Sequence, residues 1–228
     1  MAEVPYNQGF YSQHGERSLK SARIVVPLVM KLATIRSVID IGCGIGGWLR
    51  AFEENGVAAV RGLDGNYVNP SALYIAPESF TAVDLKRQVG QISREKRYDL
   101  AVCLEVAEHL DAGSGSQLVD TLTDLAPLIL FSAAVPGQGG VGHVNERWPG
   151  YWREQFRRRN FEMFDPITPL IREDHRVEWW YRQNIVMFAD SSTVPAFPGL
   201  GHALEEDKGI EWIHVNMICP LMLVCGIC

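Results

Sequence analysis

Short apolar runs that end in glycine or in an acidic residue recur along the chain. Seven of them have the length of a buried strand, namely residues 38–41, 57–63, 80–85, 98–104, 128–131, 161–164 and 184–189. The segments between several of these runs show the spacing of amphipathic helices. The pattern predicts helices at residues 17–32, 48–54, 116–125 and 148–159. Alternating strands and helices of this kind predict an α/β fold.

The first predicted helix, over residues 17–32, has one apolar face that we expect to lie against the sheet. This face comprises Leu19, Ile24, Val25, Leu28 and Val29. Pro27 lies inside the pattern and is expected to kink or split the helix, because proline removes one backbone hydrogen bond. The whole chain is interpreted as one domain, 1–228, with an N-terminal cap at 1–35, a core at 36–190 and a C-terminal extension at 191–228.

Composition narrows the class of protein without identifying it. The chain has 228 residues, 47% of them hydrophobic, which is enough to form a sizeable core. Its net charge of −6 argues against a nucleic-acid partner. No apolar run approaches the roughly 20 residues of a membrane span, and the first residues lack the features of a secretion signal. Cys43 and Cys103 fit buried thiols of a reducing compartment. We therefore expect a cytoplasmic protein without membrane contact; its oligomeric state is left open.

The glycine cluster after the first apolar run carries the clearest chemistry. Residues 37–48 read SVIDIGCGIGGW, a strand, a tight turn and the start of a helix. Gly42, Gly44 and Gly47 satisfy the dinucleotide fingerprint G-x-G-x-x-G, whereas Gly42, Gly44 and Gly46 satisfy G-x-G-x-G. Asp40 favours the second interpretation, because a carboxylate there would repel a pyrophosphate. The alternative without any ligand is a simple strand-to-helix turn.

Acidic residues also follow the next three predicted strands. Asp64 lies where a carboxylate would accept hydrogen bonds from both ribose hydroxyls of a nucleoside cofactor. An ordinary Asp-Gly turn is the alternative. Asp84 ends the third strand and Glu105 follows the fourth. Four strands with acids at the expected ends are a more specific signal than any one of them.

The pattern Asp40-x-Gly42-x-Gly44-x-Gly46 resembles motif I of the class I S-adenosylmethionine (AdoMet) methyltransferases. Together with residues 18–27, 104–110 and 143–149, it looks like a group of bacterial class I methyltransferase-domain proteins, from about Tyr6 to Ala189. The resemblance implies a seven-stranded Rossmann-like sheet with helices on both faces, and AdoMet as cofactor. It implies cofactor contacts from Asp40, Gly42, Gly44, Gly46, Asp64, Asp84, Leu85 and Leu104. It implies no particular acceptor.

The run Glu105-Val-Ala-Glu-His109 is the candidate for catalysis. We expect it to begin a helix that places Glu105 and His109 on one face, next to Glu108. With His143, these residues are similar to the metal set of small-RNA 3′-terminal 2′-O-methyltransferases and resemble ubiquinone-pathway O-methyltransferases. Acids at a helix start are also favoured by the helix dipole alone. A divalent metal is therefore allowed but not favoured, and the preferred interpretation assigns catalysis to His109, His143 and Glu105.

Two further segments are candidates for covering the site. The glycine-rich loop at residues 136–152 carries polar and aromatic side chains that suit a substrate lid, or else a connector over the sheet edge. The aromatic residues Tyr6, Phe10 and Tyr11 suggest an arm that folds over bound cofactor, or else a tail.

The sequence thus predicts an AdoMet-dependent methyltransferase that acts on a hydroxyl of a small metabolite, sugar or secondary-metabolite acceptor. A metal-assisted RNA or nucleotide 2′-O-methyltransferase is the alternative enzyme. A cofactor-binding regulatory module without catalysis is the alternative from another class, and an NAD-linked dehydrogenase ranks last.

Overall fold

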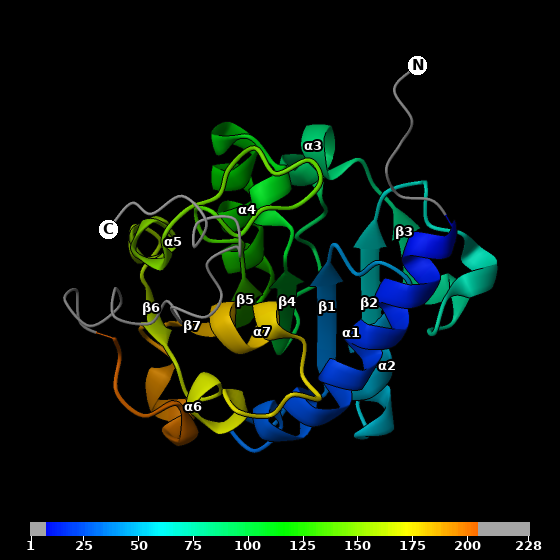
Figure 1. The fold of residues 1–228 in the computed structure, drawn as a ribbon. Coiled ribbons are helices and arrows are strands. Elements are labelled where there is room, and N and C mark those ends of the chain that lie inside the picture. Colours follow the sequence, from blue (N-terminus) through cyan, green and yellow to red (C-terminus); the bar gives the residue numbers. More distant parts are fainter. Residues whose placement is uncertain (1–7, 205–228) are drawn as a thin grey trace, which may run out of the picture.

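Seven strands form one sheet at the centre of the molecule (Figure 1). The computed structural model describes residues 8–204, with side chains from residue 15 onward. The strands are β1 (Ser37–Ile41), β2 (Ala59–Asp64), β3 (Phe80–Ala82), β4 (Leu100–Leu104), β5 (Leu128–Ser132), β6 (Phe161–Phe164) and β7 (Val186–Asp190). Their order is β3-β2-β1-β4-β5-β7-β6, and β7 runs antiparallel to the other six strands of this sheet. The expected seven-stranded α/β sheet is confirmed.

Helices cover both faces of this sheet (Figure 1). They are α1 (Gln8–Val29), α2 (Gly47–Glu54), α3 (Leu85–Gln88), α4 (Ala112–Leu125), α5 (Pro149–Arg157), α6 (Thr168–Ile171) and α7 (Trp179–Asn184). Helices α1, α2, α6 and α7 pack on one face, and α3, α4 and α5 pack on the other. The strand order reverses between β1 and β4, and ligands of open α/β sheets bind outside the carboxyl ends of the strands at such a point.

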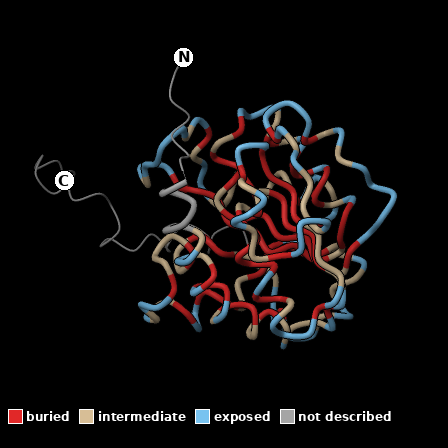
Figure 2. The backbone as a smooth tube through the Cα atoms, turned by 90° about the vertical axis from the view of Figure 1, so that its right-hand side faces the viewer, coloured by how far each residue is buried: buried red, intermediate tan, exposed pale blue. Residues whose placement is uncertain are grey.

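The central strands are buried on both faces, which explains their nearly continuous apolar runs. In β4, Leu100, Val102 and Leu104 pack on the α1 side, whereas Ala101 and Cys103 pack on the α4 side. This alternation follows from the two-residue period of a strand. Buried residues therefore gather in the interior, where the sheet lies, while exposed residues lie mainly on the outer turns and loops (Figure 2).

Most elements lie where the apolar pattern predicts them, with differences at the ends. The first helix, α1, begins earlier than expected and ends at Val29, two residues after Pro27. Its buried face includes Leu19, Val25 and Val29, while Ile24 and Leu28 are only partly buried. The third strand stops at Ala82, because Asp84 caps the short helix α3.

The expected helix directly after β4 is wrong. Glu105 has a φ of +56°, a left-handed conformation that residues with a Cβ rarely adopt. This turns the chain into a short 3₁₀ segment at Ala107–His109, and α4 begins only at Ala112 behind the N-cap of Asp111. Glu105 and His109 therefore do not share one helix face.

Some expectations fall outside the described residues. Tyr6 and the segment 205–228 lie outside them, as do the side chains of Phe10 and Tyr11, so the cofactor-covering arm stays a prediction. Across residues 8–204, none of the helices has the length and apolar character that crossing a bilayer requires.

Candidate active site

The glycine loop begins directly where β1 ends. The backbone N–H groups of Gly42 and Cys43 donate to the carbonyl of Leu63, at 2.7 and 3.2 Å. Gly42 has a φ of +84°, and a Cβ there would lie 2.2 Å from Val106. Gly44 also has a positive φ, but a Cβ at this position would meet no atom within 4 Å. The loop is thus closed on one side and open at Gly44, where a ligand can approach the backbone.

Asp64 ties this loop to the end of β2. One carboxylate oxygen accepts from the Gly44 N–H at 2.6 Å, and the other accepts from the Gly65 N–H at 2.6 Å and the Tyr67 hydroxyl at 2.5 Å. Burial raises the pKa of Asp64, although these three hydrogen bonds oppose the shift. Asp64 accepts three hydrogen bonds here, whereas a carboxylate offers about four acceptor positions. Its partner Tyr67 is half exposed. The sequence did not indicate that Asp64 also braces the loop.

The other expected cofactor residues differ in their surroundings. Asp40 is buried in β1, and its pKa is well above the usual range because burial penalises the carboxylate and Asp64 adds negative charge. Asp84 is exposed and accepts a hydrogen bond from the Lys86 N–H as the cap of α3. Leu85 and Leu104 are buried. Their contacts with a cofactor stay predictions.

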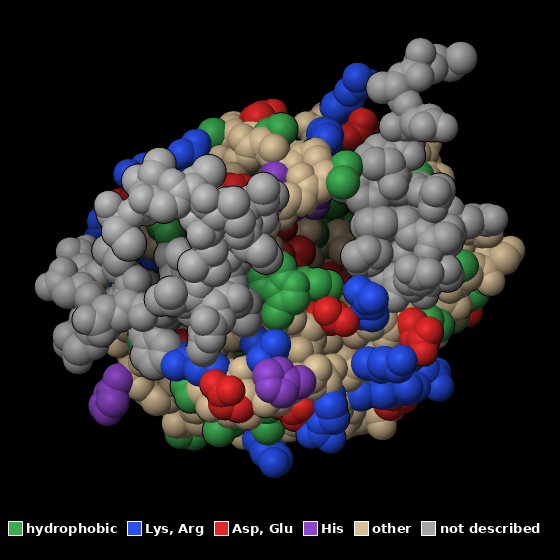
Figure 3. Space-filling model, in the orientation of Figure 1, with side chains coloured by type: hydrophobic (Ala, Val, Ile, Leu, Met, Phe, Trp, Pro, Cys, Tyr) green, Lys and Arg blue, Asp and Glu red, His purple; other side chains and the backbone are tan. Residues whose placement is uncertain are grey.

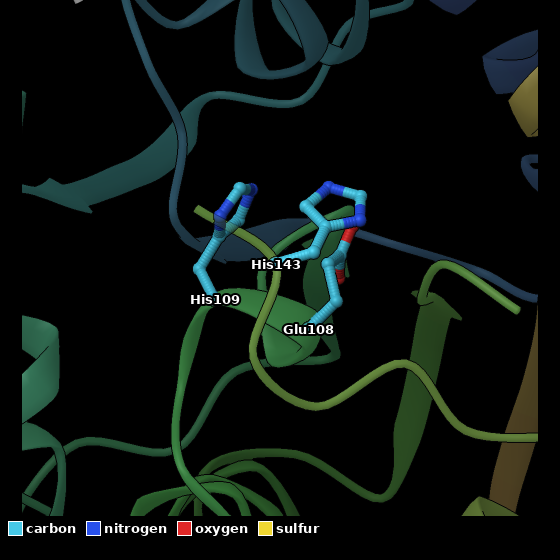
Figure 4. Close-up of side chains that lie close together, drawn as sticks. All are labelled: Glu108, His109 and His143. Carbon is cyan, nitrogen blue, oxygen red and sulfur yellow. The ribbon is translucent and has the colours of Figure 1, made fainter. Parts of the chain in front are cut away.

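Glu108, His109 and His143 come together beyond the carboxyl end of β4 (Figure 4). Their ligand atoms lie within 4.8 Å of one another, and the two imidazole rings stand edge to face with centroids 4.8 Å apart. On the face of the molecule seen in Figure 1, acidic and histidine side chains are visible in and beside the hollow at the middle (Figure 3). Of the residues expected to form a metal set, Glu105 alone lies outside this cluster.

Glu108 is the unusual member of this cluster. Its side chain is fully buried, and neither carboxylate oxygen has a hydrogen-bond partner among the described residues. Burial raises the pKa of Glu108 well above its usual range, and the charge of Glu105 raises it further, while the nearby backbone N–H groups of Glu108 and Ala134 oppose the shift without reaching hydrogen-bond geometry. Buried polar groups are nearly always hydrogen-bonded, so the carboxylate of Glu108 is a candidate ligand for a bound group.

Backbone hydrogen bonds bring His143 to this position. The N–H groups of Val144 and Asn145 donate to the carbonyl of Glu108, at 2.8 and 3.0 Å. The buried amide of Asn145 also donates to the carbonyl of Ala107 at 3.4 Å. The loop is therefore fixed to the 3₁₀ segment that carries the other two members. The sequence pointed to this loop but not to Asn145 as its anchor.

Glu105 instead belongs to a neighbouring network of amides. Its carboxylate accepts from Gln138 at 2.9 Å and from Asn184 at 3.1 Å, and Asn184 donates to Gln138 at 2.8 Å. Burial raises the pKa of Glu105, while the hydrogen bonds from Asn184, Ser132 and Gln138 oppose that shift. The sequence did not predict that Gln138 and Asn184 contact Glu105, because nothing in the apolar pattern connects a loop amide with the end of α7.

The three-residue cluster fits a divalent cation. Burial, and the proximity of His143, lower the pKa of His109 to about 4, so its imidazole is neutral and able to bind a metal at neutral pH. Two imidazoles and one carboxylate form a donor set of the kind that holds Zn²⁺, Mn²⁺ or Fe²⁺. The unpartnered oxygens of Glu108 are the observation on which this fit depends.

The sheet order and the glycine loop have the form found in the class I methyltransferases, which use AdoMet as methyl donor. A family model described as a methyltransferase domain matches residues 13–181, and the chain belongs to this family. The ubiquinone biosynthesis O-methyltransferase of Rickettsia bellii is 29% identical over 77 residues, which are 32% of this chain and 31% of that protein. The chain thus matches under a third of the length of this relative.

Solved structures show the same fold at low identity. The magnesium protoporphyrin IX methyltransferase of Synechocystis, with bound AdoMet, gives a TM-score of 0.56 at 20% identity, covering 82% of this chain and 86% of that one. A methyltransferase in complex with the Trm112 activator of Haloferax volcanii gives 0.59 at 15% identity, covering 80% and 94%. These similarities support the fold, and they carry no information about the acceptor.

A glycine next to His143 allows a direct test of this geometry. A Cβ at Gly140 would lie 2.3 Å from Nε2 of His143. We expect Gly140→Ala to displace the ring and to weaken Mn²⁺ binding by at least about 10-fold, as mispositioned metal ligands do. Gly56→Ala, after α2, is the control, because Gly56 also has a positive φ but a Cβ there meets nothing within 4 Å. Equal Mn²⁺ affinities of the two variants, measured by calorimetry, would contradict the prediction.

Proposed function

We propose that this methyltransferase transfers the methyl group of AdoMet to a hydroxyl oxygen of a small acceptor, at a site where Glu108, His109 and His143 hold a divalent cation. The observation that supports it is the buried carboxylate of Glu108, which has no partner in the described chain and lies next to two imidazoles. The cluster lies beyond the strand ends where the glycine loop also lies, so cofactor and acceptor would meet there.

The reaction is an in-line displacement. A bond forms between the acceptor oxygen and the methyl carbon, the bond from that carbon to the sulfonium breaks, and S-adenosylhomocysteine leaves. Holding the reactants at near-attack distance supplies roughly 7–11 kcal/mol of the barrier reduction. A bound cation would favour the deprotonated form of the acceptor hydroxyl. Glu105 lies within electrostatic reach of Glu108 and His143 but outside the cluster, and is the proposed proton acceptor.

A small acceptor suits the charge distribution better than RNA does. The arginines near the end of α5 are paired with acids: Arg157 and Arg158 contact Glu154, and Arg159 contacts Asp120. Together with the net charge of −6, this argues against α5 as a binding face for a phosphate backbone. The named activity of the Rickettsia relative supports oxygen as the acceptor atom.

The proposal is tested by binding and by turnover. Calorimetry should show binding of AdoMet, S-adenosylhomocysteine and Mn²⁺, and no binding of NAD. Release of S-adenosylhomocysteine should be measured over a panel of phenols and sugars, with and without chelator. We expect a hydroxylated acceptor to be methylated, with the rate lost on chelation and restored by Mn²⁺.

Each contrary result removes a different part of the proposal. Tight binding of NAD without AdoMet would overturn the cofactor assignment. Full turnover in excess chelator would overturn the cation and leave His109, with its neutral imidazole, as the general base. AdoMet binding without methylation of any acceptor would favour a non-catalytic module.

A further inference from the structure

The carboxylate of Glu146 accepts three hydrogen bonds beside the cluster. Oε2 accepts from the N–H of Gly137 at 2.9 Å, and Oε1 accepts from the N–H of Gly139 at 3.0 Å. Oε1 also lies 2.9 Å from Nδ1 of His143. A single side chain thus ties both arms of the glycine-rich loop to each other, and this loop carries one member of the proposed cation site.

The contact with Glu146 determines which nitrogen of His143 carries a proton. An ionised carboxylate can only accept hydrogen bonds, so Nδ1 must be the protonated nitrogen. The same carboxylate also accepts from two backbone N–H groups, those of Gly137 and Gly139, so all three of its contacts here use it as an acceptor. A neutral His143 then carries its lone pair on Nε2, the nitrogen that can bind a cation or accept a proton.

The same carboxylate also acts on the amide network. Gln138 lies between the two glycines whose N–H groups Glu146 accepts. Its side chain donates to Glu105 at 2.9 Å and accepts from Asn184 at 2.8 Å. Fixing the backbone on both sides of Gln138 therefore fixes the group that holds Glu105. Glu146 is thereby connected to both halves of the site, His143 on one side and Glu105 on the other.

We infer that Glu146 is a positioning residue: it fixes His143 as the Nδ1–H tautomer and holds Gln138 against Glu105. This arrangement, a carboxylate behind a ligating histidine, orients the ring and strengthens the ligand in metal sites. The tautomer follows from the contacts of Glu146 alone. Its consequence for cation affinity rests on the proposed function.

The tautomer is measured on the metal-free, ¹⁵N-labelled protein by long-range ¹H–¹⁵N correlation of its histidine rings. The chain has six histidines, and the variant His143→Asn assigns the signal. We expect Nδ1 protonated and Nε2 unprotonated in the wild type. Glu146→Ala should shift the population toward Nε2–H, the form that imidazole side chains prefer in water. An Nε2–H ring in the wild type, or an unchanged Nδ1–H ring in the variant, would overturn the inference.

The isosteric variant Glu146→Gln keeps the volume and guards against loss of folding. Calorimetry with Mn²⁺ should show affinity about 10- to 100-fold below wild type, with AdoMet affinity unchanged, and kcat should fall while KM for AdoMet stays constant. The control is Glu154→Gln on α5, whose carboxylate pairs with Arg157 and Arg158. An unchanged tautomer together with unchanged Mn²⁺ affinity in Glu146→Gln would refute the role. A wild type that binds no Mn²⁺ would overturn the proposed cation, while the tautomer would still decide on Glu146.

Discussion

Replacing Glu108 by glutamine is expected to abolish Mn²⁺ binding and to lower turnover by about 10²- to 10³-fold, the range for losing one preorganised hydrogen-bond donor in an active site. The same change should stabilise the metal-free protein, because the wild type buries a carboxylate with no partner among the described residues. The expected gain in the free energy of unfolding is about 1–3 kcal/mol. Activity is measured as release of S-adenosylhomocysteine, and stability by denaturation in chelator.

The stability gain should depend on pH. The folded protein raises the pKa of Glu108 through burial, so the stability contributed by this group is present at acidic pH and is lost as the pH rises through the folded pKa. Wild type and Glu108→Gln should therefore be closest in stability near pH 4, and should diverge toward pH 8. Glu162→Gln, at an exposed position of β6, is the control and should change neither quantity. A Glu108→Gln variant that is less stable than wild type at pH 8 would mean that the carboxylate has a partner.

Removing the carboxylate of Asp64 should have the second large effect, a loss of affinity for AdoMet. Hydrogen bonds to a charged group contribute about 1.5–3 kcal/mol each. If Asp64 accepts both ribose hydroxyls, Asp64→Ala should weaken AdoMet by about 10²- to 10⁴-fold. Part of this loss comes from the Gly44 N–H, which Asp64 holds at 2.6 Å.

Two companion variants separate these roles of Asp64. Asp64→Asn keeps one oxygen to brace the glycine loop while removing the charge, and should still bind AdoMet more weakly than wild type. Tyr67→Phe removes only the hydroxyl that donates to Asp64, so AdoMet affinity should stay within a few-fold of wild type. An unchanged AdoMet affinity in Asp64→Ala would reduce Asp64 to a turn residue.

The strands were predictable because of the environment they occupy. A parallel strand covered by helices on both faces must be apolar at nearly every position, so β1, β4 and β5 stand out as apolar runs in the chain. The glycine loop was predictable for a related reason. A Cβ at Gly42 would collide with Val106, and that steric limit leaves a mark in the sequence.

The helix expected directly after β4 does not form, because a left-handed turn replaces it. The composition of the segment does not indicate that turn. The run from Glu105 to His109 has acceptable helix formers, and nothing in it marks the left-handed backbone at Glu105. Local strain of this kind persists only where surrounding contacts hold it. Those contacts come from Gln138 and Asn184, which are distant in the sequence.

The sequence by itself determined the sheet, the glycine loop and the pool of acids and histidines near the strand ends, because periodicity and glycine reflect constraints that act locally. Tertiary structure alone decided which of these acids and histidines form the three-residue cluster and which belong to the amide network. Docking of residues 143–145 onto the carbonyl of Glu108 joined His143 to Glu108 and His109. The turn at Glu105 directed its carboxylate to the amides. Burial and hydrogen bonding between distant segments set the charge state of each group, and no local pattern records them.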